Sequence, residues 1–61
     1  MLKFHYWAVT NTGATQSIDV VDQSETGANV DAKMQVENWL DQINLRPTDL
    51  SRFDLVSVTP A

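Results

Sequence analysis

The sequence predicts a small α+β domain, a two-layer ββαβ fold with one helix packed on one face of a three-stranded antiparallel sheet of order 2-1-3. Residues 2–10 and 15–22 alternate side chains in the manner of strands, and residues 30–44 repeat apolar side chains in the manner of a helix. The chain of 61 residues is expected to form one domain, 1–61. A chain this short buries about 60% of the surface that its unfolded form exposes, so its stability margin is small.

The first two strands are expected to form a hairpin around residues 11–13. A three-residue loop sets Tyr6 opposite Ile18 and makes one face of the hairpin apolar. A two-residue loop slips the register by one residue and sets Tyr6 opposite Asp19, which is a poorer pair. We prefer the first register, which places His5 beside Asp19 on the other face.

The polar residues 23–28 are typical of a connector, and the side chain of Asn29 can cap a helix. We expect the helix to run from Val30 to Asn44, because Pro47 prevents much continuation. One stripe follows the spacing of a buried helix face. Its members are Ala32, Val36, Trp39, Leu40 and Ile43.

A connector with a short turn at residues 48–50 is expected to lead into a third strand at 53–59. Its alternate residues divide between two faces, Phe53, Leu55 and Ser57 on one and Asp54, Val56 and Val58 on the other. The helix brings this strand back antiparallel to the first strand, which becomes the central one. We expect the helix to cover the face of Tyr6 and to leave the face of Trp7 open; the reverse arrangement is the alternative.

The composition argues against several classes of function. The net charge is −4 with only four lysines and arginines, which are too few and too scattered to contact a phosphate backbone. One histidine without cysteine cannot form a zinc site, and two glycines cannot form a glycine-rich phosphate loop. We therefore expect no direct nucleic-acid binding, no cofactor, no metal site and no enzymatic activity.

A Ser-His-Asp set can be written from Ser17, His5 and Asp19, which lie near one another in the preferred register. These residues would lie on a flat sheet face that has no oxyanion donor and no nucleophile elbow. We interpret His5 and Asp19 as a cross-strand pair on the surface.

The sequence instead favours binding of a partner protein, one with a basic surface such as a nucleic-acid-binding protein. Six acids stand against one lysine between Asp19 and Asp41, and this excess can also serve solubility alone. An exposed face that carries Trp7 suggests a contact site. The candidate partner-binding residues are His5, Trp7, Val9, Asp19, Asp22, Glu25, Asp31, Met34, Glu37 and Asp41.

Two resemblances accompany this interpretation. The segment Phe4-x-Tyr6-x-Ala8-Val9-x-x-x-Gly13 resembles the start of small soluble segments in the inner-membrane platform proteins of type II secretion and type IV pilus systems. It lacks their later glycine and their basic, Leu-rich helix. In its size, acidity and lack of catalytic motifs, the chain is similar to phage-encoded inhibitors such as anti-CRISPR proteins, some of which occupy basic nucleic-acid channels.

The second resemblance implies a small acidic inhibitor or regulator that blocks a surface of its partner. The alternative is a structural or assembly module that forms a homodimer through its sheet or belongs to a larger machine. No stretch approaches the roughly 18 apolar residues of a membrane span, and the N-terminus lacks the order of a signal peptide. We expect no membrane association and a cytoplasmic location.

Overall fold

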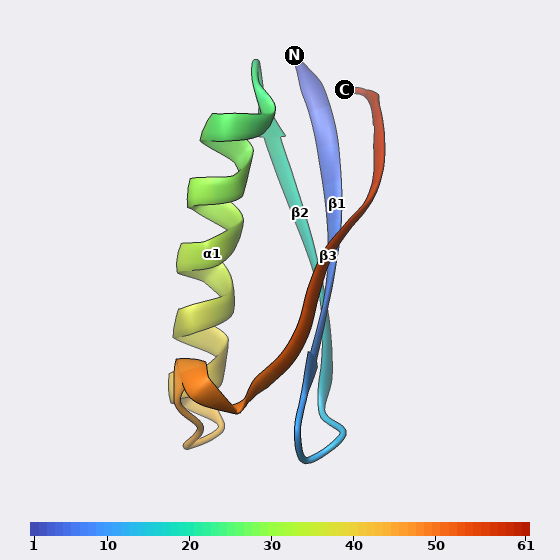
Figure 1. Cartoon of the computed structure of the whole chain (residues 1–61). Helices are drawn as coiled ribbons and strands as arrows, with labels where there is room; N and C mark the ends of the chain where they lie inside the picture. Colours follow the sequence, from blue (N-terminus) through green and yellow to red (C-terminus); the bar gives the residue numbers. More distant parts are fainter.

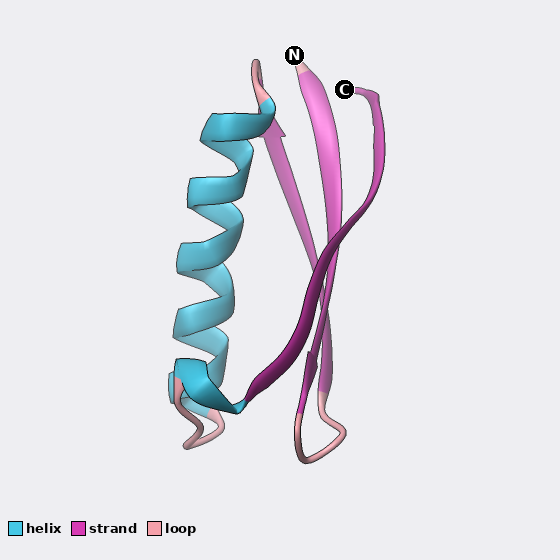
Figure 2. Cartoon of the chain, viewed as in Figure 1, coloured by secondary structure: helices cyan, strands magenta, loops and turns pink.

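The computed structural model describes residues 1–61 and confirms the predicted fold class. The three strands form one antiparallel sheet of order β2-β1-β3, with a single α-helix along one side (Figure 1, Figure 2). The elements in chain order are β1 (Leu2–Thr10), β2 (Thr15–Asp22), α1 (Glu25–Gln42), the 3₁₀ helix η1 (Pro47–Asp49) and β3 (Leu50–Pro60). No helix combines the length and the apolarity that a membrane span requires.

The hairpin between β1 and β2 has the predicted three-residue loop and register, with His5 opposite Asp19. Gly13 has a φ of 90°, in the region that residues with a side chain rarely adopt. Its N–H donates to the carbonyl of Thr10 at 3.1 Å. The buried hydroxyl of Thr10 accepts from the N–H of Ala14 at 3.1 Å, so this hydroxyl has a partner within the hairpin.

The helix begins at Glu25 and not at Val30, so the predicted connector before it is wrong. Ser24 is the N-cap, and its hydroxyl accepts from the N–H of Gly27 at 3.2 Å. The glycine suggested a loop, but it lies in the first turn of the helix. Asn29, the predicted cap, lies about one turn inside the helix instead.

The start of α1 depends on a close approach between Asp22 and Gly27. The Asp22 carboxylate accepts from the N–H groups of Gln23 at 2.6 Å and Ser24 at 3.1 Å. A Cβ atom on Gly27 would lie 2.7 Å from Asp22 Oδ2. Gly27 is therefore the residue that lets this carboxylate reach the two N–H groups before the helix.

The helix ends through a left-handed residue, Asn44, which has a φ of 61° and confirms the predicted stop. The N–H of Leu45 donates to the carbonyl of Leu40 at 2.8 Å, the bond of a Schellman motif. The last helical residue is Gln42. Ile43, which we expected in the buried stripe, is the C-cap and is 38% exposed, because the chain turns away at this point.

Strand β3 extends beyond the predicted range 53–59 at both ends, and η1 takes the place of the predicted turn before it. Its pairing with β1 shifts by one residue at Ser51 and again at Val56, which are β-bulges. The second bulge places Val58 opposite Phe4, on the helix side of the sheet. The prediction that Val58 shares a face with Asp54 and Val56 is therefore wrong. The prediction that Ser57 shares a face with Phe53 and Leu55 is also wrong, because Ser57 lies opposite His5.

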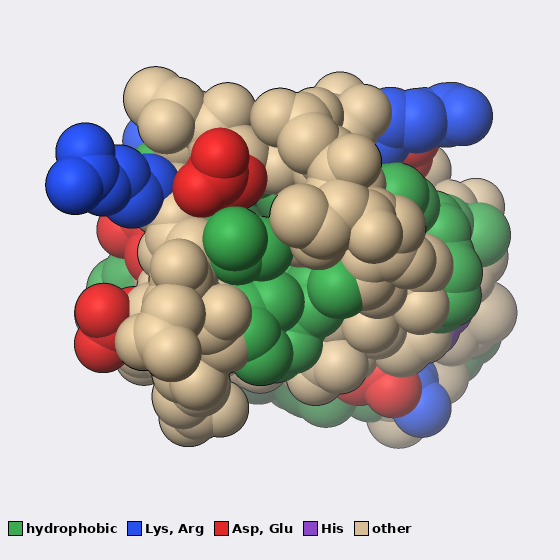
Figure 3. Space-filling model, turned by 90° about the horizontal axis from the view of Figure 1, so that it is seen from below, with side chains coloured by type: hydrophobic (Ala, Val, Ile, Leu, Met, Phe, Trp, Pro, Cys, Tyr) green, Lys and Arg blue, Asp and Glu red, His purple; other side chains and the backbone are tan.

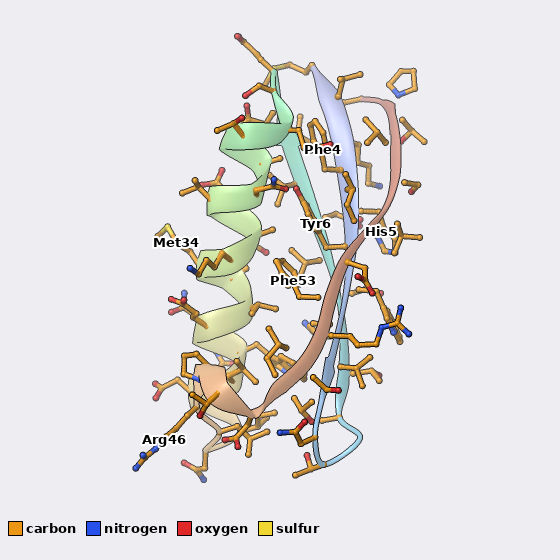
Figure 4. All side chains as sticks on the ribbon, in the orientation of Figure 1. Phe4, His5, Tyr6, Met34, Arg46 and Phe53 are labelled. Atoms are coloured by element: carbon orange, nitrogen blue, oxygen red, sulfur yellow. The ribbon has the colours of Figure 1, made fainter.

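The core lies between α1 and the sheet, on the face that we expected the helix to cover. Phe4, Tyr6 and Phe53 point toward α1, and His5 points to the opposite side (Figure 4). The helix packs mainly on β2 and β1 and hardly touches β3. The buried hydrophobic residues are Phe4, Tyr6, Ala8, Ile18, Val20, Ala28, Ala32, Val36 and Leu40. Trp39 is partly buried and packs against them.

Replacement of Leu40 tests this packing. Leu40 is 0% exposed, so Leu40→Ala should lower the free energy of unfolding by about 2–5 kcal/mol through lost burial and a cavity. Urea denaturation measures the change. Met34→Ala removes an apolar side chain that is 58% exposed on the same helix and should change stability by less than about 0.5 kcal/mol. Equal effects of the two substitutions would contradict the packing described.

Gly27→Ala tests the start of the helix. Helix propensity alone predicts a gain of up to about 1 kcal/mol for this change. We expect a loss, because the added Cβ would push the Asp22 carboxylate off its two N–H partners. In an Asp22→Ala background the same substitution should be stabilising, which a double-mutant cycle in urea measures. A gain in both backgrounds would show that the close approach has no energetic role.

Candidate functional site

The outer side of the sheet, which we name the Trp7 face, has no other segment of the chain over it. Trp7 lies on the central strand β1 between Ser17 of β2 and Asp54 of β3, and is 40% exposed. Its neighbour Val9 is partly buried. The residues of the Trp7 face are Lys3, His5, Trp7 and Val9 of β1, Thr15, Ser17, Asp19 and Val21 of β2, and Arg52, Asp54, Ser57 and Thr59 of β3.

The charged side chains of the Trp7 face are paired with one another. His5 Nδ1 lies 2.6 Å from Asp19 Oδ1, which confirms the predicted cross-strand pair, and Lys3 Nζ lies 3.9 Å from Asp19 Oδ2. The hydrogen bond from His5 is the main cause that lowers the pKa of Asp19, and the charge of Lys3 adds to it. Within β3, Arg52 Nη2 lies 3.1 Å from Oδ2 of Asp54, two residues along the same strand.

A second group of predicted residues lies on the opposite side of the molecule, on the exposed surface of α1. We name it the acidic helix face; its residues are Asp31, Met34, Glu37 and Asp41. Met34 points away from the sheet (Figure 4). None of the three acids forms an ion pair within the chain, in contrast to the carboxylates of the Trp7 face.

The two remaining predicted residues lie where β2 meets α1. The carboxylate of Asp22 holds the N–H groups before the helix, so its position is explained by the fold. Glu25 is in the first turn of α1, where a negative charge suits the helix dipole. The ten predicted residues are thus divided among two opposite faces and one junction and do not form one site.

A pocket that we did not predict opens between α1 and β3, with a volume of about 380 Å³. Its lining residues are Tyr6, Glu25, Asn29, Lys33, Phe53 and Leu55. The ring of Tyr6 stacks on that of Phe53 with centroids 5.3 Å apart. The Tyr6 hydroxyl donates to Asn29 Oδ1 at 2.5 Å, and burial, with the charges of Glu25 and Asp22, raises the pKa of Tyr6.

The sequence carried one signal that could have located this pocket. Phe53 and Leu55 were predicted to share one face of the third strand, which is the helix side if the strand is in phase with Tyr6. One helix is too narrow to cover a sheet of three strands. A pocket was therefore to be expected over the edge strand that the helix does not cover, and in the structure that strand is β3.

A further apolar surface lies at the end of the molecule that carries the hairpin loop. Seen from this end, hydrophobic side chains gather between the helix and the sheet (Figure 3). Leu45 and Leu50 follow the end of α1 and pack against the core, with Ile43 more exposed beside them. This surface holds η1 and the start of β3 in place, together with the bond from the Asn11 N–H to the Asp49 carbonyl at 2.8 Å.

The histidine, the candidate serine and the pocket do not come together in one place. The one histidine lies on the side of the sheet opposite the pocket, and Ser17 makes no hydrogen bond with it. No group of three or more acids and histidine is placed to hold a metal ion. No family model, curated protein or solved structure matches this chain.

The pairing of His5 with Asp19 can be tested by titration. In His5→Ala, the pKa of Asp19 should rise toward its ordinary value of 3.8, because the largest cause that lowers it is removed. Carboxyl carbon shifts in NMR measure this change. Lys3→Ala is the matched control and should raise the pKa less.

The same pair predicts a dependence of stability on pH. A carboxyl with a lowered pKa stabilises the fold above its unfolded pKa, and this contribution is lost as the pH falls through the folded pKa. The stability of the wild-type protein should therefore fall more steeply below pH 3.8 than that of His5→Ala. Identical acid profiles would contradict the role of the hydrogen bond.

Proposed function

We propose that this chain is a non-enzymatic module that binds a partner protein through the Trp7 face and thereby acts as an inhibitor or regulator of that partner. The observation that supports the proposal is the open sheet face with Trp7 at its centre, 40% exposed. A half-exposed Trp is a frequent energetic centre of protein interfaces.

The surroundings of Trp7 suit such an interface. Trp7 and Val9 are successive residues of β1 on this face, with the pair of His5 and Asp19 on one side of them and the pair of Arg52 and Asp54 beside them on β3. Val21, which is 52% exposed, lies beyond the pair of His5 and Asp19. Interfaces commonly have an apolar centre and a polar rim. Because β1 is paired on both sides, Trp7 is held by a rigid strand, and little conformational freedom is lost on binding.

The acidic helix face supports a partner with a basic surface. Its unpaired carboxylates create a negative field on one side of the molecule, which raises the rate of encounter with a positively charged protein. A protein that binds nucleic acids would present such a surface, as do the targets of some phage-encoded inhibitors to which the chain is similar in character. We place this activity in the cytoplasm, in keeping with a small domain that has no cysteine.

A second candidate function is that of an assembly module that associates with itself through its sheet. The observation that favours it is the outer edge of β3, which pairs with no other strand of the chain. Such an edge can accept a strand from another molecule.

The partner-binding proposal is tested by affinity capture from a lysate of the native host, followed by titration of the captured partner. Trp7→Ala should weaken its binding by about thirtyfold or more, as expected for an interface centre. Met34→Ala changes an exposed apolar residue on the opposite side and should leave the affinity unchanged. If Trp7→Ala leaves the affinity unchanged and Met34→Ala lowers it, the binding site lies on the helix and the proposed site is wrong. If no protein is captured at low salt, the result counts against the proposal.

A further inference from the structure

Strand β3 is a long edge strand with few of the features that protect such an edge from pairing. It runs from Leu50 to Pro60, contains no glycine, and has proline only as its last residue. Protected edges are commonly short, covered or rich in lysine, whereas this strand carries only two charged residues, Arg52 and Asp54. The opposite edge strand, β2, lies under α1.

The bulges limit the part of β3 that can accept another strand. The pairing with β1 shifts at Ser51 and at Val56, and η1 ends just before Leu50. Bulges disturb the ladder and increase the local twist. The regular part of the edge is therefore the segment from Arg52 to Leu55, and a second strand would pair within this segment.

The charges in this segment are complementary to those of a second copy in one antiparallel register. A two-fold axis through Phe53 sets Arg52 opposite Asp54 of the second copy, and the symmetry repeats the pair on the other side of the axis. An axis through Arg52 would set two arginines opposite each other, and an axis through Asp54 two aspartates. Within one chain the two side chains pair with each other at 3.1 Å, and both stay exposed, at 72% and 51%. In the dimer each would exchange this partner for the same partner on the second copy, or share it.

The same register brings together apolar groups that α1 leaves partly uncovered. Phe53 and Leu55 lie on the helix side of β3, are only partly buried, and line the pocket beside α1. Pairing about Phe53 makes the two Phe53 rings cross-strand neighbours. In each copy, the Phe53 ring is also stacked on the ring of Tyr6. The contact would thus remove apolar surface from water on one face and join opposite charges on the other.

We propose that the protein forms a homodimer by antiparallel pairing of β3 with β3 of a second copy, with Phe53 on the two-fold axis. The two sheets then join into one sheet of order β2-β1-β3-β3-β1-β2. This inference rests on the assembly function and adds to it the partner, the edge and the register. The Trp7 face of each copy stays open on the joined sheet.

Sedimentation velocity over a dilution series tests the dimer with three variants. Arg52→Asp and Asp54→Arg each place like charges opposite one another twice, so each should raise the dimer dissociation constant by about tenfold or more. Asp31→Arg makes the same charge change as Asp54→Arg on the acidic helix face and should behave as the wild type. Circular dichroism confirms that each variant is folded.

Mixing the two edge variants separates this interface from an effect within one chain. An Arg52→Asp chain carries acids at both positions and an Asp54→Arg chain carries bases at both, so an equal mixture should regain the dimer that each lacks alone. A dimeric wild type that ignores both substitutions, with no gain on mixing, would overturn this interface and leave the assembly function standing. A wild type that is monomeric at every concentration would overturn both, without affecting the partner proposal.

Discussion

An α-helix with its side chains is about 10 Å across, and neighbouring strands lie about 4.8 Å apart, so one helix covers about two strands. This chain has one helix and three strands. The helix packs mainly on β2 and less on β1, and Ala28 and Ala32, both 0% exposed, belong to the core on this side. The outer side of the sheet and the helix side of β3 are consequently left without cover.

The charges of the molecule also differ between the open side of the sheet and the exposed side of the helix. On the Trp7 face the carboxylates of Asp19 and Asp54 are paired with cations or with His5, so this face is nearly neutral. On the acidic helix face the carboxylates are unpaired. A partner that approaches from far away responds to the field of the helix, whereas the energy of a close contact would come from the apolar groups of the sheet.

The sequence predicted the hairpin well because two periodic signals agree there. The alternation of apolar and polar residues assigned side chains to the two faces of the hairpin. The apolar pair of Tyr6 with Ile18 then favoured the register that the structure has. The start of the helix was missed because Gly27 indicated a loop and Asn29 offered a cap, while the capping by Ser24 depends on the approach of Asp22 that only the folded chain provides.

Other features left no local mark in the sequence. A bulge is one extra residue in a strand, and no residue type near Val56 indicates it. The alternation was therefore continued through Val56, and Val58 was assigned to the wrong face. The sequence pattern selected the candidate binding residues one by one. Their division between the Trp7 face, the acidic helix face and the junction of β2 with α1 depends on how the helix packs on the sheet. The pocket depends on which two strands the helix covers, which alternation alone does not determine.

The openness of the Trp7 face is tested most directly by NMR of the dilute protein with a soluble paramagnetic probe. The account predicts strong broadening of the Trp7 indole N–H signal, together with protection of the methyl groups of Leu40, which is 0% exposed. A Trp7 indole protected as fully as Leu40 would mean that part of the chain covers this side of the sheet, and would contradict the account.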